Sequence, residues 1–217
     1  MVRNINKIIM RFRFSKQNDI RYISHLDLIT LLIRALRRAK IPIHYSRGYH
    51  PKLKLSTAFA LKVGWESIGE YADIVLKKKL LPDLFKERLN NQLPEGVEIL
   101  KAICGSSSKS LSNQINCAKY QITLSHYHKK KELEKIKKVQ YFRERLFNIK
   151  IRELNNNILT LNFLTPIGSG NDLDINDFIK FLNSIKSELR FILERVLRVN
   201  MYRKEGDFLL SPLSLLK

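Results

Sequence analysis

Basic and aromatic residues gather in one stretch of the chain, from Arg21 to Ser56. No Asp or Glu occurs between Asp27 and Glu66, so the positive charges of this stretch have no carboxylate nearby in the sequence. Guanidinium and ammonium groups bind phosphate, and aromatic rings beside them stack on nucleic-acid bases. The residues that we expect to contact a nucleic acid are Arg21, His25, Arg34, Arg37, Arg38, Arg47, Tyr49, His50, Lys52 and Lys54.

Three features of this stretch allow a second interpretation. His25 could serve as a general acid or base, or contact phosphate at the start of a helix, or only hydrogen-bond locally and order the turn. The helical arginines could form a solvated face, although the lack of nearby carboxylates favours phosphate binding. Tyr45 could be a strand residue packed on the core, which leaves Tyr49 and His50 as the better candidates for stacking on bases.

Neither a metal site nor a cofactor site is expected from the acidic residues and glycines. The spacing of Glu66, Glu70 and Asp73 fits no metal motif, and Asp27 is explained by helix capping. The sequence Gly-Ser-Gly at 168–170 is too short for a phosphate loop and lacks a following lysine. We therefore predict no metal and no bound cofactor.

The composition predicts a folded protein with a polyanionic partner. The 217 residues include 40 Lys plus Arg against 20 Asp plus Glu, which gives a net charge of +20, and 44% are hydrophobic. Such a positive surface gains affinity for nucleic acid by releasing counterions from phosphates. Two cysteines without metal-ligand spacing indicate a reducing compartment, and we recognise neither a signal peptide nor an apolar stretch of about 20 residues. We therefore expect a cytoplasmic protein without a membrane partner.

Hydropathy patterns in the first half predict the order strand, helix, strand, strand, helix, strand. The alternation over 8–14 is typical of a half-buried strand with one apolar face and one arginine face, and a polar turn is expected at 16–19. Ser24 is placed as the N-cap of a helix over 25–39. The apolar stripe of that helix is predicted to consist of Leu26, Ile29, Leu32, Ile33 and Leu36. The other predicted elements are strands at 43–45 with 53–63 and at 71–76, a helix at 83–93 and a strand at 97–103.

The second half is predicted to repeat the same order after a linker. The serine-rich stretch 105–116 predicts a boundary between domains at 1–104 and 117–217. Beyond it we expect strands at 119–124, 148–153, 158–164 and 195–203, with helices at 129–147 and from Asp174 onward. The βαββαβ order is that of the ferredoxin-like unit. The predicted fold class is therefore α+β, with two tandem ferredoxin-like domains.

Five separated motifs in the first half resemble one bacterial protein family. They are RYISHLDL (21–28), RALRRAKIP (34–42), YSRGYHPKLKLS (45–56), GWESIGEYADI (64–74) and LPEGVEIL (93–100). In this order they resemble the radical-SAM-linked proteins, which occur alone or fused behind a radical SAM enzyme. The resemblance implies work alongside such an enzyme. Because two cysteines twelve or more residues apart cannot ligate a radical SAM cluster, we expect that enzyme to be a separate polypeptide.

One departure from the family pattern favours binding over catalysis. Where the family reads Gly-Phe-Asn-Pro-His-Pro-Lys, this chain reads Gly-Tyr-His-Pro-Lys-Leu-Lys at 48–54, so that Lys52 replaces a histidine. Lysine still contacts phosphate, but it does not replace a catalytic or metal-binding histidine. We expect an RNA-binding accessory protein that presents tRNA or rRNA to a radical SAM enzyme.

Two alternatives stay open. Paired ferredoxin-like domains with a histidine near the first helix also resemble, in architecture, the repeat-processing RNA endonucleases of CRISPR systems. In a metal-independent nuclease of that kind His25 would be catalytic. The second alternative is a docking subunit whose basic surface binds an acidic protein.

Overall fold

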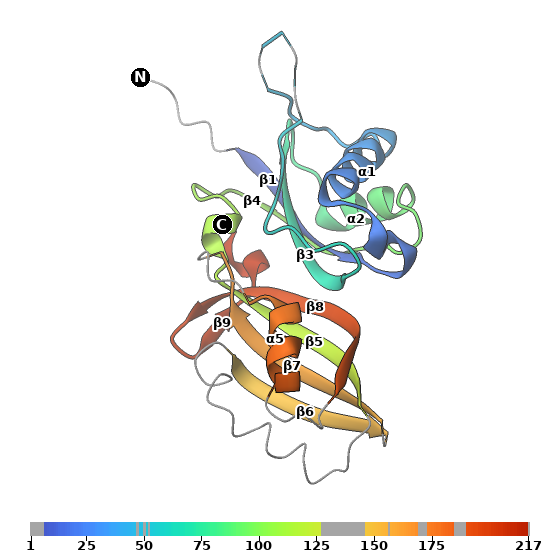
Figure 1. Ribbon diagram of the computed structural model, residues 1–217. Coiled ribbons are helices and arrows are strands. Elements are labelled where there is room, and N and C mark those ends of the chain that lie inside the picture. Colours follow the sequence, from blue (N-terminus) through green and yellow to red (C-terminus); the bar gives the residue numbers. More distant parts are fainter. Residues whose placement is uncertain are drawn as a thin grey trace. The chain divides into compact units, whose positions relative to one another are not determined.

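The computed structural model describes residues 7–46, 48–49, 51, 53–126, 146–155, 157–168, 173–184 and 190–216. The chain divides into two compact units (Figure 1). The first unit contains residues 1–115 and 202–217, and the second contains residues 116–201. Both combine β-strands with α-helix, so the fold is of the mixed α+β kind.

The first unit is an antiparallel sheet with both of its α-helices on one face (Figure 1). Strand β1 pairs with β3 on one side and with β4 on the other, and β2 pairs with β3. The spatial order is therefore β4-β1-β3-β2. The elements are β1 (Ile8–Lys16), η1 (Asn18–Tyr22), α1 (His25–Arg38), β2 (Leu55–Thr57), β3 (Glu66–Leu76), α2 (Pro82–Asn90), β4 (Ile99–Gly105), η2 (Ser112–Gln114), β9 (Phe208–Leu210) and η3 (Pro212–Leu215).

Helix α1 begins and ends close to where the sequence predicts. The Oγ atom of Ser24 accepts a hydrogen bond from the backbone N–H of Asp27 at 3.1 Å, and the Ser24 hydroxyl donates to the Asp27 carboxylate at 2.7 Å. These bonds satisfy groups that a helix N-terminus leaves unpaired, so the predicted N-cap is confirmed.

The predicted apolar stripe of α1 is wrong at its first position. Leu32 and Leu36 are buried as expected, but the side chain of Leu26 is 75% exposed. Leu28 and Ala35 take part in the core instead, where they join strand residues such as Phe12. Phe12 also packs against Phe85 of α2, with ring centroids 5.3 Å apart, so one core serves both helices and the sheet.

The second face of β1 is covered, contrary to the expectation of an exposed arginine face. The Arg11 side chain is 0% exposed and donates to both carboxylate oxygens of Asp73 on β3, at 2.7 and 2.9 Å. Its Nη1 donates at 2.7 Å to the side-chain oxygen of Gln114 and at 2.7 Å to the carbonyl of Pro212. Segments far apart in the sequence, η2 and η3, therefore meet on this arginine.

The expected polar turn at 16–19 is also wrong at its first residue. Lys16 is the last residue of β1 and is buried, and its Nζ donates to the carbonyls of Arg21 and Ile23 at 3.2 and 2.8 Å. A buried ammonium group requires such partners, because burial without them costs several kcal/mol. Lys16 thus ties the end of the first strand to the chain that enters α1.

The second unit contains one described helix on a face of an antiparallel sheet (Figure 1). Its strands lie in the order β8-β5-β7-β6. Phe163 of β7 packs against Phe178 of α5, with ring centroids 6.0 Å apart. The elements are β5 (Cys117–His126), β6 (Phe147–Asn155), β7 (Ile158–Pro166), α5 (Ile175–Ser184) and β8 (Phe191–Glu205). The last residues of β8 belong to the first unit and pair there with β9.

Most predicted elements occur, with different bounds. In the segment predicted as a strand at 43–45, Ile43 and Tyr45 form only isolated bridges. The segment predicted at 53–63 contributes only the short strand β2, since 58–65 consists of bends, turns and irregular chain. The helix expected at 129–147 falls almost wholly outside the described residues, and its last residue, Phe147, begins β6 instead. The last predicted strand starts earlier than expected, at Phe191. Among the described residues, no helix has the length and apolar character that crossing a bilayer requires.

Gly96 fixes the turn after α2 against the end of β1, and Gly96→Ala is expected to destabilise the protein. Its φ is +89°, and an added Cβ would lie 2.5 Å from the carbonyl oxygen of Gln17. The Gln17 N–H donates to the Gly96 carbonyl at 2.8 Å, so these backbones cannot separate freely. Positive φ costs about 1–3 kcal/mol for a residue with a side chain, and the clash adds to that.

Gly64→Ala is a matched control for this prediction. Gly64 has a similar φ of +84°, but nothing lies within 4 Å of its added Cβ. Urea denaturation should show a larger loss of unfolding free energy for Gly96→Ala than for Gly64→Ala. Equal losses would mean that the close approach to Gln17 contributes nothing.

Candidate functional site

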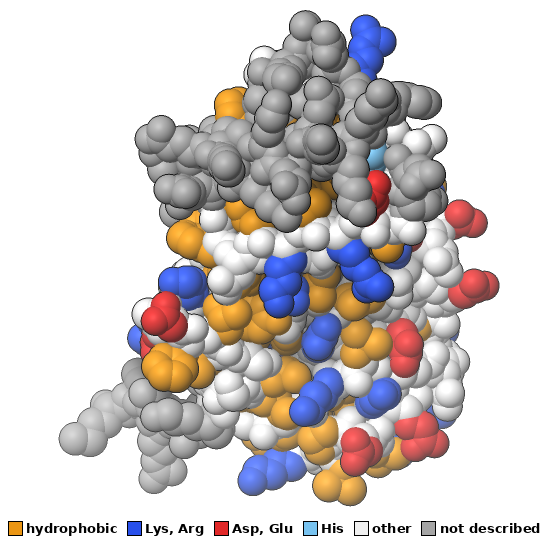
Figure 2. All heavy atoms as spheres, turned by 90° about the horizontal axis from the view of Figure 1, so that it is seen from below, with side chains coloured by type: hydrophobic (Ala, Val, Ile, Leu, Met, Phe, Trp, Pro, Cys, Tyr) orange, Lys and Arg blue, Asp and Glu red, His pale blue; other side chains and the backbone are white. Residues whose placement is uncertain are grey.

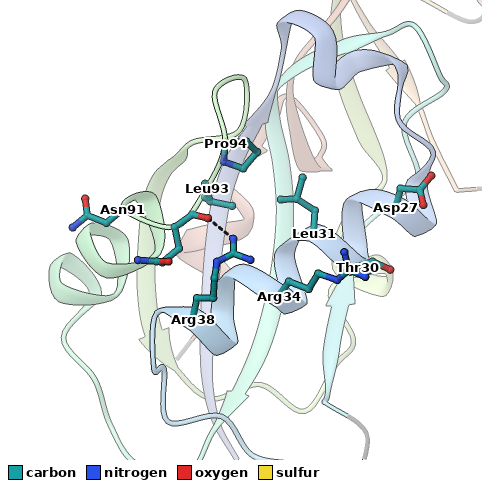
Figure 3. A pocket seen from close by; sticks show the side chains of 9 residues that line it. Asp27, Thr30, Leu31, Arg34, Arg38, Asn91, Leu93 and Pro94 are labelled. Atoms are coloured by element: carbon teal, nitrogen blue, oxygen red, sulfur yellow. Dashed lines mark hydrogen bonds between the residues drawn. The ribbon is translucent and has the colours of Figure 1, made fainter.

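A surface pocket of about 610 Å³ lies between α1 and the turn that follows α2. Figure 3 shows the side chains of Arg34 and Arg38 on α1, with Leu93 and Pro94 across from them. We call it the arginine pocket. The residues that line it are Asp27, Thr30, Leu31, Arg34, Arg38, Asn91, Gln92, Leu93 and Pro94.

The arginines of α1 are close together because of helical spacing. Arg37 and Arg38 follow Arg34 by three and four residues, which places their side chains within one turn of each other. Arg38 donates to the carbonyl of Gln92 at 2.7 Å, whereas no hydrogen bond or ion pair is recorded for the side chain of Arg34 or Arg37 within the described chain. The two guanidinium groups of Arg34 and Arg37 are therefore available to an anion.

The helix itself accounts for part of this arrangement. Arg37 and Arg38 lie in the last turn of α1, where positive side chains interact favourably with the helix dipole. Arg34 lies one turn earlier and lines the pocket together with Arg38. The helix dipole therefore does not account for the position of Arg34.

The rest of the pocket offers apolar contact and one acidic group. Leu31 stands between the arginines and Pro94, and Asp27 and Asn91 lie at opposite ends (Figure 3). The Asp27 carboxylate already accepts a hydrogen bond from the Ser24 hydroxyl at the N-cap of α1. The pocket therefore combines two guanidinium groups with an apolar floor.

Arg21 is held by neighbours outside the arginine pocket. It donates to the Tyr22 hydroxyl at 2.7 Å, and its guanidinium carbon lies 4.7 Å from the centre of the Tyr22 ring. Its Nη1 lies 3.6 Å from the buried carboxylate of Glu66. The hydrogen bond to Tyr22 is the main cause that raises the pKa of Arg21 above its ordinary value, and the charges of Glu66 and Asp19 add to it. Much of this charge is thus compensated within the protein.

His25 is the first residue of α1 and contacts β2. Its Nε2 lies 3.3 Å from the Thr57 hydroxyl oxygen, in a partly buried position, and the tautomer of His25 decides which group donates. The contact orders the start of the helix against the sheet. A catalytic role for His25 stays a prediction.

The loop between α1 and β2 extends from the end of the sheet (Figure 1). Tyr45 forms a bridge with Leu53 and packs against the core, which agrees with its interpretation as a structural residue. Tyr49 of this loop is 98% exposed, and Lys54 is exposed as well. The other predicted contacts of this loop, Arg47, His50 and Lys52, lie outside the described residues.

Sequence reasoning did not find the second wall of the arginine pocket. Asn91, Gln92, Leu93 and Pro94 come from the end of α2 and the turn after it, more than 50 residues from the arginines. The predicted helix at 83–93 and strand at 97–103 imply a turn between them, but nothing local shows that it faces α1. Across the described part of the chain, no group of three or more His, Cys, Asp or Glu residues is placed to hold a metal.

Comparisons with known proteins identify a family. A search of curated proteins finds no match. The crystal structure of an unknown protein from Galdieria sulphuraria aligns over 87% of this chain and 97% of its own, at 9% identity and a TM-score of 0.26. Residues 10–201 match the family described as an uncharacterized protein conserved in bacteria, DUF2344. Because that match spans most of the chain, the protein belongs to the DUF2344 family of bacteria.

Proposed function

We propose that the protein binds structured RNA through α1 and presents it to a radical SAM enzyme supplied by a separate polypeptide. The observation that carries the proposal is the arginine pocket, in which Arg34 faces an apolar floor with no recorded partner of its own. An exposed guanidinium group of this kind can donate charge-assisted hydrogen bonds to a phosphate.

The chemistry of the pocket fits a nucleotide better than a simple anion. Arginine can bind a phosphate with two parallel hydrogen bonds, and Leu31, Leu93 and Pro94 offer apolar contact to a sugar or base. Asn91 and Thr30 add groups that can both donate and accept hydrogen bonds. An acidic peptide would use the guanidinium groups but would leave the apolar floor without a defined partner.

The charge of the whole chain supports a long polyanion as the ligand. The net charge is +20, and Lys or Arg occurs in both units. One pocket lined by two arginines would not require such an excess, whereas RNA presents phosphates to a broad surface. The exposed ring of Tyr49 can stack on an unpaired base.

The strand orders support two ferredoxin-like modules. If the four strands of each unit are numbered in chain order, both units have the same spatial order of strands, fourth-first-third-second. These are β4-β1-β3-β2 in the first unit and β8-β5-β7-β6 in the second. In the second unit the segment that would hold the first helix lies outside the described residues. We propose that both units are of this kind. Many RNA-binding modules use such folds, but the fold alone does not imply the function.

The link to a radical SAM enzyme rests on the sequence motifs alone. The five motifs from Arg21 to Leu100 resemble proteins that accompany such enzymes. Three of these motifs contain residues of α1 or of the loop that carries Tyr49. The motifs are therefore part of the surface that we propose to bind RNA. We propose that the enzyme acts on the RNA that this chain holds.

Binding of the purified protein to a fluorescent stem-loop RNA tests the proposal. We expect the logarithm of the affinity to fall linearly with the logarithm of the salt concentration. Each phosphate contacted should make the slope of this line steeper by about 0.7 to 0.9. No binding, or an affinity that salt does not change, would contradict it. RNA recovered intact after incubation in chelator agrees with binding alone, whereas cleavage that His25→Ala abolishes would establish a nuclease instead.

A further inference from the structure

The sheet of the second unit has one face covered by α5 and another that carries polar and basic side chains. The covered face includes Tyr120 and Phe163, which pack toward Phe178 of α5. In an antiparallel pair, residues directly opposite each other point to the same face, and successive residues alternate. The strand register therefore assigns each side chain to a face.

Two rows of side chains cross three strands on the other face, which we call the polar sheet face. Each row takes one residue from β5, one from β7 and one from β6. The rows are Gln121 with Asn162 and Lys150, and Thr123 with Thr160 and Arg152. Neither row contains a carboxylate or an aromatic ring.

The charged ends of these rows have no partner in the described part of the chain. Lys150 and Arg152 are exposed on β6, which ends the strand order of this unit. They are two residues apart, so their side chains leave the strand about 7 Å from each other. The structure records no side-chain hydrogen bond or ion pair for either of them, nor for Gln121 and Asn162, among the described residues.

One carboxylate on this face accepts a hydrogen bond from a neighbouring strand. Glu194 of β8 accepts the hydroxyl of Ser125 at 2.6 Å, at the opposite side of the sheet from β6. Lys119 lies two residues before Gln121 on β5 and thus on the same face, in a row that continues with Leu164 of β7 and Phe147 of β6. The view from below Figure 1 shows Lys and Arg side chains spread among hydrophobic ones, with Asp and Glu side chains also present (Figure 2).

We propose that the polar sheet face is a second RNA-binding surface, which holds the sugar–phosphate backbone. Lys150 and Arg152 bind phosphates, and the amides of Gln121 and Asn162 can donate to and accept from a 2′-hydroxyl. Because the two rows lack aromatic rings, they do not provide the stacking platform that unpaired bases require. The inference rests on the proposed RNA binding and adds a contact surface on the second unit.

A charge-neutralising double variant tests this surface in the full-length protein. Lys150→Gln with Arg152→Gln should weaken binding to the stem-loop RNA about tenfold. The slope of log affinity against log salt should become shallower by about 1.4 to 1.8, as expected for two lost phosphate contacts. The matched control is Lys109→Gln with Lys180→Gln, which removes the same charge from exposed positions outside this face.

The outcomes separate this inference from the proposed function. If the wild-type protein binds RNA but the variant matches it in affinity and slope, the polar sheet face is not an RNA surface and the pocket proposal stands. If the control loses as much as the variant, net charge alone explains the loss and the inference is overturned. If poly-glutamate competes as well as RNA at equal ionic strength, the face does not select RNA. If the wild-type protein binds no RNA, both proposals are wrong.

Discussion

Arg11→Met is expected to lower the free energy of unfolding by about 3–5 kcal/mol, the cost of removing one partner from a buried ion pair. The Arg11 side chain is fully buried and makes four hydrogen bonds, two to Asp73, one to Gln114 and one to the carbonyl of Pro212. Methionine has a similar length but donates to none of them. The Asp73 carboxylate would then be left in a dry site without its cation.

The effect should reach beyond the pair itself, because Arg11 joins three parts of the chain. Gln114 belongs to η2 and Pro212 to η3, and both approach β1 through this guanidinium group. The backbone amides of η2 and of residues 213–215 should exchange faster with deuterium in the variant. An expected consequence is that the C-terminal residues 212–215 detach at a lower urea concentration than the sheet.

Urea denaturation of Arg11→Met beside Arg88→Met measures this prediction. Arg88 is exposed on α2, so its replacement should change stability by less than about 0.5 kcal/mol. In the double variant Arg11→Met with Asp73→Leu the loss should be smaller than in Arg11→Met, because no charge remains buried alone. Equal stability of Arg11→Met and Arg88→Met would show that the network does not hold the unit together.

Reversing two charges on α1 should weaken RNA binding about 100-fold. Arg34→Glu with Arg37→Glu removes two guanidinium groups and places carboxylates near the phosphates that they would bind. A hydrogen bond to a charged group contributes about 1.5 kcal/mol or more, so each arginine should account for roughly tenfold. Folding should be retained, because both side chains are exposed and have no recorded partner in the described residues.

The control for this variant is Lys101→Glu with Lys109→Glu. Both lysines are exposed, in the same unit and away from α1, and the net charge changes equally. Fluorescence anisotropy with the stem-loop RNA should show a small loss for the control and a large one for the α1 variant. Similar losses in the two proteins would mean that α1 has no special role.

Local patterns were sufficient to predict α1 and its cap, but not which of its residues are buried. Ser24 and Asp27 interact within one turn, so the sequence contains the whole signal. Leu26 and Leu28 both fit a helical stripe with Leu32, and only the position of the sheet decides between them. The helix can therefore be predicted from its own residues, whereas its orientation depends on the rest of the unit.

The role of Arg11 could not be read from the alternation of β1. A strand with arginines on one face has the same pattern whether that face meets water or other parts of the chain. Here the covering groups come from Gln114 and Pro212, 103 and 201 residues away in the sequence. The same limit applies to the arginine pocket, where Arg34 was predicted as a contact but Gln92 and its neighbours were not.

Ultraviolet crosslinking of the full-length protein to a stem-loop RNA, followed by mass spectrometry of the peptides, tests whether α1 and the arginine pocket bind RNA. We expect crosslinked nucleotides on peptides that contain 27–38, Tyr49 or 91–94, and their loss in Arg34→Glu with Arg37→Glu. Crosslinks confined to other parts of the chain, or unchanged by that variant, would contradict it.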